Sequence, residues 1–109
     1  MTNVVLKDIR KTVDIALPSF PESKVTLYQG LLFGQMKELE VAKTDLERGM
    51  LILRLMIKDW NFTDEAGKKL AVSEENLNVF PMEDLTLLLE KTAEYFSETV
   101  KKNRKNLKS

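Results

Sequence analysis

The stretch Met50–Leu70 reads M-L-I-L-R-L-M-I-K-D-W-N-F-T-D-E-A-G-K-K-L, and its pattern decides how the rest of the chain must fold. Its first eight residues are apolar except for Arg54. A helix this apolar buries most of its circumference, either in the core of its own chain or against a partner. The second half holds the single tryptophan, Trp60, with Phe62 two residues later and then a glycine-containing turn. The stretch contains no catalytic motif, so it indicates burial and assembly.

A helix start lies directly upstream of this stretch. Residues 44–47 read T-D-L-E, which is a capping-box pattern, and two acidic residues in a first turn suit the positive end of a helix. We expect this helix to run to about Asp59. Gly49 costs about 1 kcal/mol in a helix interior relative to alanine, which favours close packing against a neighbour at that position. The inward stripe is predicted to consist of Leu46, Met50, Leu53, Ile57 and Trp60.

The N-terminal part favours two strands. Residues 12–17 alternate apolar and polar side chains, and residues 24–28 (K-V-T-L-Y) are β-branched and aromatic. Between them, P-S-F-P-E-S contains two prolines, which we expect to interrupt regular structure. The sequence therefore predicts a β-hairpin with a six-residue loop. Because a lone hairpin is marginal in water, it has to pack on the helices that follow.

Three further helices are expected. The first is short and runs from about Gln35 to Val41. The second has Ser73 as its N-cap, and the last begins at Pro81, a residue well suited to a first turn. The inward stripe of the last helix is predicted to contain Leu85, Leu88, Leu89, Thr92, Phe96 and Val100.

These elements predict a single α+β domain over residues 1–100. We expect it to be mostly helical, with an N-terminal β-hairpin followed by two main helices and short connecting helices. The two main helices should pack through Leu46–Trp60 and Leu85–Val100.

All seventeen acidic residues precede residue 100, whereas five of the seventeen basic residues fall within 101–109. The domain therefore carries a net charge of −5 and the tail carries +5, and we expect residues 101–109 to be a frayed helix end.

The composition excludes several function classes. The chain has no cysteine and no histidine, so it lacks thiolate ligands, the commonest general base and the commonest zinc ligand. The acidic residues from Asp59 onward fail as a calcium loop, because the sixth and twelfth positions hold Asp64 and Leu70 where glycine and glutamate are needed. We therefore expect no enzyme activity, no catalytic residue, no cofactor and no metal.

No apolar run approaches the roughly 20 residues that span a bilayer, and the N-terminus lacks a secretory pattern, so a cytoplasmic protein without membrane contacts is expected.

The methionines and aromatic residues leave two interpretations open. Methionine fills cores, and it also forms adaptable contact surfaces because its side chain is flexible and polarisable. Tryptophan and phenylalanine likewise serve either as core anchors or as binding hot spots. The candidate partner-binding residues on this reasoning are Met50, Met56, Trp60, Phe62 and Met82.

The segment I-K-D-W-N-F-T-D-E-A-G-K-K-L (57–70), followed by S-E-E-N-L (73–77) and P-M-E-D-L (81–85), resembles the tail assembly chaperones of long-tailed bacteriophages. The upstream L-P-S-F and V-T-L-Y-Q-G-L-L-F-G are also similar to the N-terminal part of that family. The resemblance covers about residues 12–100. One departure is Ala71, where the family pattern has proline, and it concerns the local turn.

The resemblance implies a non-enzymatic protein of the infected bacterium's cytoplasm that is absent from the mature virion. It would bind the tape measure protein, keep its long apolar helices soluble and help tail tube protein to polymerise around it; self-association is a further expectation. Many relatives have a longer product made by a frameshift, and Lys101-Lys102-Asn103 is compatible with a slippery A-AAA-AAC heptamer. Two alternatives stay open. One is a phage structural or connector protein, and the other is a small nucleic-acid-binding protein that uses its basic tail.

Overall fold

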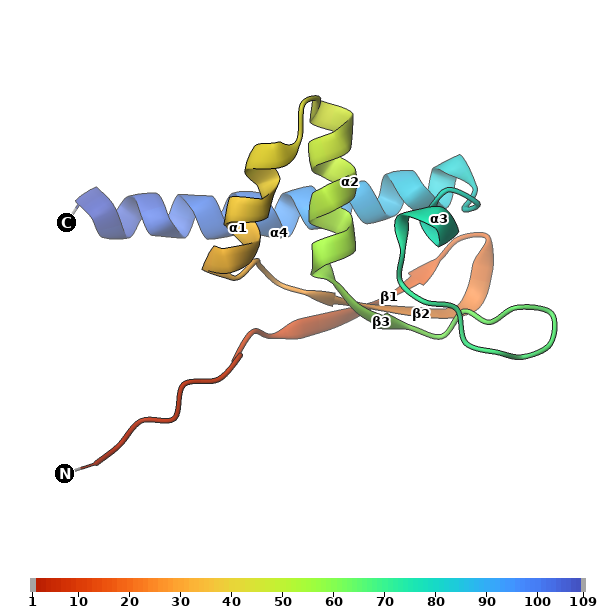
Figure 1. The fold of residues 1–109 in the computed structure, drawn as a ribbon, viewed down its shortest axis with the longest axis horizontal. Helices are drawn as coiled ribbons and strands as arrows, with labels where there is room; N and C mark the ends of the chain where they lie inside the picture. The colour runs from red at the N-terminus through yellow and green to blue at the C-terminus, as the bar shows by residue number, and fades with distance from the viewer. Residues whose placement is uncertain (1, 109) are drawn as a thin grey trace.

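The protein combines a small antiparallel sheet with helices on one of its faces (Figure 1). The computed structural model describes residues 2–108, and it describes side chains as far as Phe96. Three strands pair in the order β1-β2-β3, and β2 is central. The predicted α+β class is confirmed. Helix accounts for 42% of the chain and strand for 22%, so a mostly helical fold is not confirmed.

The N-terminal hairpin is tighter than predicted. Strand β1 (Thr12–Leu17) pairs with β2 (Phe20–Tyr28), and Leu17 lies opposite Phe20, so two residues form the turn instead of six. The expectation that Pro21 excludes regular structure was wrong. The register is irregular between Ile15 and Leu17, and the N–H of Leu17 donates to Ser23 Oγ at 2.8 Å instead of to a strand carbonyl. A proline in such a bulge costs no ladder hydrogen bond.

The helix expected to reach Asp59 ends three residues earlier. Helix α2 (Asp45–Met56) passes directly into strand β3 (Ile57–Trp60), and β3 pairs antiparallel with β2. Ile57 and Trp60 are buried while the two residues between them are exposed, a spacing that a helix stripe and a short strand share. The strand prevails because β2 supplies hydrogen-bonding partners for its backbone, and the third strand stabilises the hairpin.

The predicted start of α2 is confirmed. Thr44 Oγ1 accepts a hydrogen bond of 3.1 Å from the N–H of Glu47. The Glu47 carboxylate accepts one of 2.8 Å from the N–H of Lys43, one residue before the position that a standard capping box uses. Both bonds satisfy backbone donors that a helix start leaves unpaired.

The remaining helices follow the prediction with shifted bounds. Helix α1 (Phe33–Glu38) begins two residues early and continues into the 3-10 turn η1 (Leu39–Val41). Helix α3 (Glu74–Leu77) has the predicted cap, because Ser73 Oγ accepts from the N–H of Asn76 at 3.3 Å. Helix α4 (Met82–Lys108) follows Pro81. Its backbone includes most of the basic tail, and the side chains of residues 97–108, Val100 among them, lie outside the described part.

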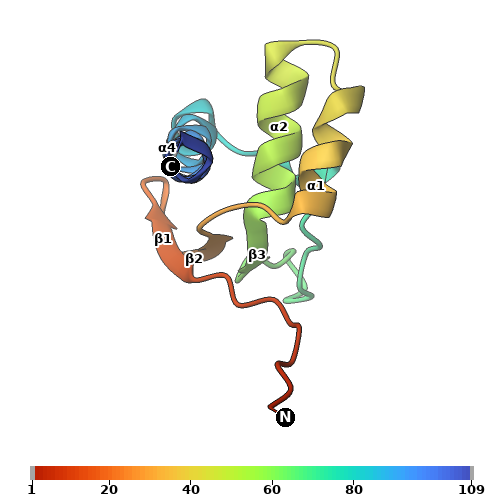
Figure 2. The same ribbon diagram turned by 90° about the vertical axis from the view of Figure 1, so that its left-hand side faces the viewer.

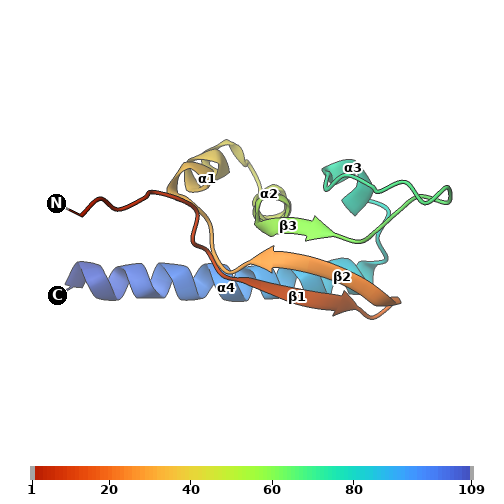
Figure 3. The ribbon, with the colours of Figure 1, turned by 90° about the horizontal axis from the view of Figure 1, so that it is seen from below.

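The core lies where α2 and α4 meet the sheet. Helix α2 stands on the sheet, while α4 runs alongside the β1–β2 hairpin (Figures 2 and 3). In the predicted stripe of α4, Leu88 and Thr92 are buried and Leu85 is half-buried. The main cluster of buried residues consists of Leu17, Val25, Leu27, Leu53, Ile57, Trp60, Leu77 and Leu88. Within residues 2–108, no helix is long and apolar enough to cross a membrane.

Candidate functional site: a helix-lined apolar groove

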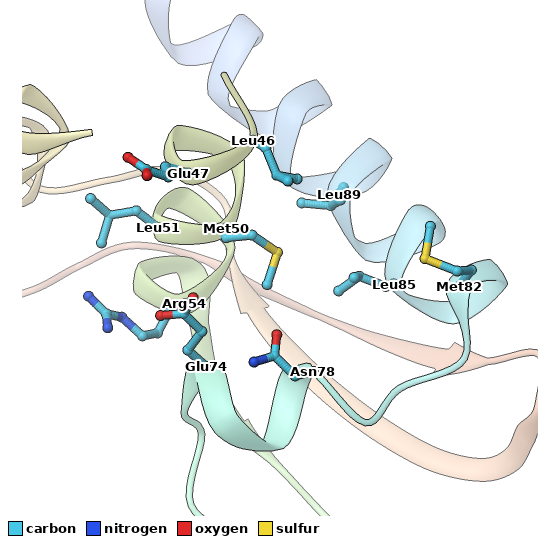
Figure 4. A pocket seen from close by; sticks show the side chains of 10 residues that line it. All are labelled: Leu46, Glu47, Met50, Leu51, Arg54, Glu74, Asn78, Met82, Leu85 and Leu89. Carbon is cyan, nitrogen blue, oxygen red and sulfur yellow. The ribbon is translucent and has the colours of Figure 1, made fainter. Parts of the chain in front are cut away.

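An open groove of about 610 Å³ lies between α2, α3 and α4 (Figure 4). Side chains of α2 form one wall, the first turns of α4 form the other, and α3 closes one end. Most of the surface is aliphatic or thioether. The lining residues are Leu46, Glu47, Met50, Leu51, Arg54, Glu74, Asn78, Met82, Leu85 and Leu89.

Helical spacing places these side chains on the groove. Positions 46 and 50 on α2 are four residues apart, as are 85 and 89 on α4, so each pair lies on one face of its helix. Met50 and Leu85 point toward each other across the groove, and both are half-buried (Figure 4). Leu46 and Met82 are 69% and 74% exposed, which makes them an open apolar rim. Two helix faces therefore leave an apolar trough that is accessible from outside.

Charged side chains frame this trough. Glu47 and Arg54 come from α2, and Glu74 comes from α3. Arg54 and Glu74 form no ion pair with any residue whose side chain is described. Charges without a partner at the edge of an apolar surface are available to orient a bound segment.

The predicted partner-binding residues separate into two groups. Met50 and Met82 line the groove. Met56 and Trp60 are buried, with 0% and 3% of their surface exposed, so in this fold they offer no surface for a partner. Phe62 is half-buried and packs edge-on against Trp60, with ring centroids 5.5 Å apart. The core interpretation therefore holds for these last three residues.

An indole hydrogen bond shows why Trp60 is fixed in the core. Its Nε1–H donates to the carbonyl oxygen of Leu70 at 2.8 Å, which ties β3 to the loop that follows it. Phe80, just before α4, lies 5.5 Å from the Trp60 ring and 5.1 Å from that of Phe62. The W-N-F segment thus holds together three parts of the chain.

The acidic residues near this segment have structural partners. Lys69 Nζ lies 2.6 Å from Asp59 Oδ1, and this hydrogen bond lowers the pKa of the Asp59 carboxyl. Asp64 Oδ1 accepts hydrogen bonds of 2.9 Å from the N–H groups of Ala66 and Lys68 in the turn. Among the residues whose side chains are described, no group of three potential ligands is arranged to hold a metal ion.

Sequence reasoning missed most of the groove wall. Of the residues assigned to inward stripes, Met50, Leu85 and Leu89 pack against the main cluster of buried residues as predicted and also line the groove. Leu46 lines the groove and is 69% exposed, so its inward assignment was wrong. The available signal was the width of the apolar surface on α2, which exceeds what one core contact requires. The predicted frameshift region, Lys101 to Asn103, lies on the backbone of α4, and its side chains are outside the described part.

Comparison with known proteins finds no relative of this chain. No protein-family model, no curated protein and no solved structure matches this chain. The groove therefore has to be interpreted from its own residues. It is an open, mostly apolar surface between two helices, with charged side chains at its edges, and such a surface is suited to binding the apolar face of another segment.

Proposed function

We propose that this protein is a non-enzymatic phage tail assembly chaperone whose groove binds apolar helix faces of the tape measure protein. In the cytoplasm of an infected bacterium it keeps those helices soluble and helps tail tube protein to assemble around them. It is absent from the mature virion. The resemblance of residues 57–70 and of the segments after them to that family supports the proposal.

The observation that carries the proposal is the open groove between α2 and α4. A helix presents apolar side chains at i, i+3, i+4 and i+7, and a trough between two helices accepts such a row. Met50 and Met82 contribute flexible thioether side chains at the floor and rim. Flexible side chains accommodate different apolar sequences, which suits a client that presents many helical segments along its length.

The test is to coexpress the chain with a helical fragment of the tape measure protein encoded by the same phage and to measure the soluble fraction of that fragment. The test variant is the double substitution Leu46→Asp with Met82→Asp. Both side chains are mostly exposed and both lie in the first turn of a helix, where aspartate is favourable, so the variant is expected to fold. The control is Val41→Asp in η1, which is 75% exposed and outside the groove.

The wild-type chain and the Val41→Asp control are expected to keep the fragment in solution, and the groove variant is expected to lose this effect. Equal solubilisation by a folded groove variant would show that the groove is not the binding site. A fragment that stays insoluble with the wild-type chain would contradict the proposed function itself. Circular dichroism of each variant verifies that its helices are intact.

The connector alternative makes the opposite prediction about the virion. A chaperone leaves the assembled tail, whereas a structural protein stays in it. Mass spectrometry of purified virions should therefore detect tube and tape measure proteins without this chain. Detection of this chain in stoichiometric amounts would favour the structural alternative.

A further inference from the structure

Residues 2–11 form an arm without regular secondary structure that extends from the sheet (Figure 1). The arm carries four large aliphatic side chains, and between 78% and 99% of the surface of each is exposed. These residues are Val4, Val5, Leu6 and Ile9. Aliphatic side chains concentrated in one exposed segment mark a surface that another surface covers.

The base of the arm is fixed to the body by Arg10. Its guanidinium lies 3.6 Å over the ring of Tyr28 and donates hydrogen bonds of 3.1 Å to the carbonyl oxygen of Gly30 and to Gln35 Oε1. A carboxylate oxygen of Asp8 lies 2.8 Å from the same guanidinium. These contacts set the direction in which residues 2–9 leave the body.

That direction is away from the groove of the same copy. The Arg10 contacts lie beside the start of α1, whereas the groove is lined by α2, α3 and the beginning of α4. In Figure 1 the arm extends on the side opposite to α3. The arm can reach its own groove only if it reverses at Arg10 and breaks these contacts, but the groove of a second copy imposes no such reversal.

The side-chain pattern of the arm fits a trough better than a sheet edge. In an extended segment, successive side chains point to opposite sides, so an arm that docks in extended form directs Val5 away from Val4 and Leu6. Addition to a strand edge would leave one of these sides in water. A groove with helices on both sides covers both.

Charge also favours this pairing. Lys7, Arg10 and Lys11 outweigh Asp8, so the arm carries a net charge of +2, whereas the groove edge carries two glutamates and one arginine. A basic segment entering a groove with a net negative edge is electrostatically complementary. We propose that the arm of one copy docks into the groove of a second copy, with the aliphatic side chains of residues 4–6 against Met50, Leu85 and Leu89.

Such a contact joins two different surfaces, so it produces either a reciprocal dimer or a head-to-tail series of copies. The pairing itself does not depend on the chaperone function. A further consequence does rest on the proposed function. A tape measure helix has to displace the arm, and the arm covers the groove until a client arrives.

The first test is analytical ultracentrifugation over a range of protein concentrations. The arm variant is Leu6→Asp, at a side chain that is 99% exposed, and the groove variant is Leu46→Asp with Met82→Asp. We expect wild type and the Val41→Asp control to associate as concentration rises, whereas each of the two variants stays monomeric. A wild-type chain that is monomeric throughout, or a variant that associates as wild type does, would overturn the proposal.

Mixing the two variants gives a sharper test. The arm variant keeps an intact groove, and the groove variant keeps an intact arm, so one functional contact can form between them. The mixture should yield a one-to-one complex and nothing larger. Pairing between two arms would instead give a homodimer of the groove variant, and pairing between two grooves would give a homodimer of the arm variant. A mixture that stays monomeric would exclude the proposed contact.

The tape measure fragment separates this inference from the proposed function. If the arm competes for the groove, the Leu6→Asp variant binds the fragment more tightly than wild type does, by about tenfold if arm and groove are nine-tenths paired at the working concentration. Association of the mixed variants without any binding of the fragment would contradict the chaperone proposal and leave the arm contact standing. Fragment binding of equal strength by both chains would contradict the competition.

Discussion

The backbone N–H of Ser19 donates a hydrogen bond of 3.0 Å to Oδ1 of Asp84, and this bond joins the β1–β2 turn to the first turn of α4. The hydroxyl of Ser19 also donates to Glu83 Oε1 at 2.7 Å. Asp84 is fully buried, and its second carboxylate oxygen accepts no hydrogen bond from any described residue. A buried polar group in this position fastens two elements that are 65 residues apart in the sequence.

Replacing Asp84 by alanine should lower the free energy of unfolding by about 1–3 kcal/mol, because the N–H of Ser19 loses its acceptor in a part-buried hydrogen bond. Asp84→Asn keeps an oxygen at Oδ1 and should cost less. Urea unfolding followed by the fluorescence of Trp60 measures both. Glu83→Ala removes the exposed neighbouring contact and serves as the control, with an expected change within about 0.5 kcal/mol. A larger loss for Glu83→Ala than for Asp84→Ala would contradict this account.

The methionines should differ sharply in their contribution to stability. Met56 is fully buried beside Leu39 and Ile52, so Met56→Ala leaves a cavity and should cost about 2–5 kcal/mol. Met82 is 74% exposed, and Met82→Ala should change stability by no more than about 0.5 kcal/mol. Thermal unfolding by circular dichroism compares the two variants directly. Similar melting temperatures would argue against the placement of Met56 in the core.

Gly49 lies in the interior of α2 without the close packing that the sequence suggested. A Cβ at this position would meet Leu89 Cδ2 at 3.8 Å, which is an ordinary van der Waals distance. Gly49→Ala should therefore stabilise the protein by about 0.5–1 kcal/mol through helix propensity. Gly67 has a φ of +84°, so Gly67→Ala should destabilise it. Chemical denaturation that ranks the two variants in the reverse order would contradict the backbone geometry.

The carboxyl of Asp8 should titrate well below its usual range. A hydrogen bond from the Arg10 side chain lowers the pKa of Asp8 from 3.8 to about 2. Because the folded state favours the carboxylate, this contribution to stability is present above about pH 4 and is lost as the pH falls toward 2. An NMR titration of the Asp8 carboxyl carbon measures the pKa. Arg10→Gln should return it toward 3.8, and an unchanged value would show that Arg10 is not the cause.

Local capping chemistry was readable from the sequence. Thr44 and Ser73 were correctly identified as helix caps. In each case the cap hydroxyl accepts a hydrogen bond from the backbone N–H only three residues later, so the contact depends on the local sequence alone. The end of α2 was not readable. Ile57 and Trp60 continue the helical stripe and also fit a strand, and the deciding contact is with Val25 and Leu27, far away in the sequence.

The groove was partly predictable, because one of its walls is visible in the local sequence pattern of α2. An over-apolar α2 indicated burial in the core or against a partner, and two of the candidate partner-binding residues, Met50 and Met82, line the groove. Met56 is six residues after Met50, which places it on a different side of the helix. That side is buried by packing against Leu39 of η1, which the helical period of α2 does not reveal. The approach of residues 82–89 to α2 depends on long-range packing that periodicity does not encode.

The junction between α2 and β3 has a consequence for engineering. Helix α2 ends at Met56 and β3 begins at Ile57, with no residue between them. The rotation of α2 about its own axis is therefore coupled to the pairing register of β3. Inserting one residue at this junction, with β3 held in register, would turn α2 by about 100° and swing Met50 out of the groove. Through this junction, the pairing of β3 with β2 determines which side chains of α2 face the groove.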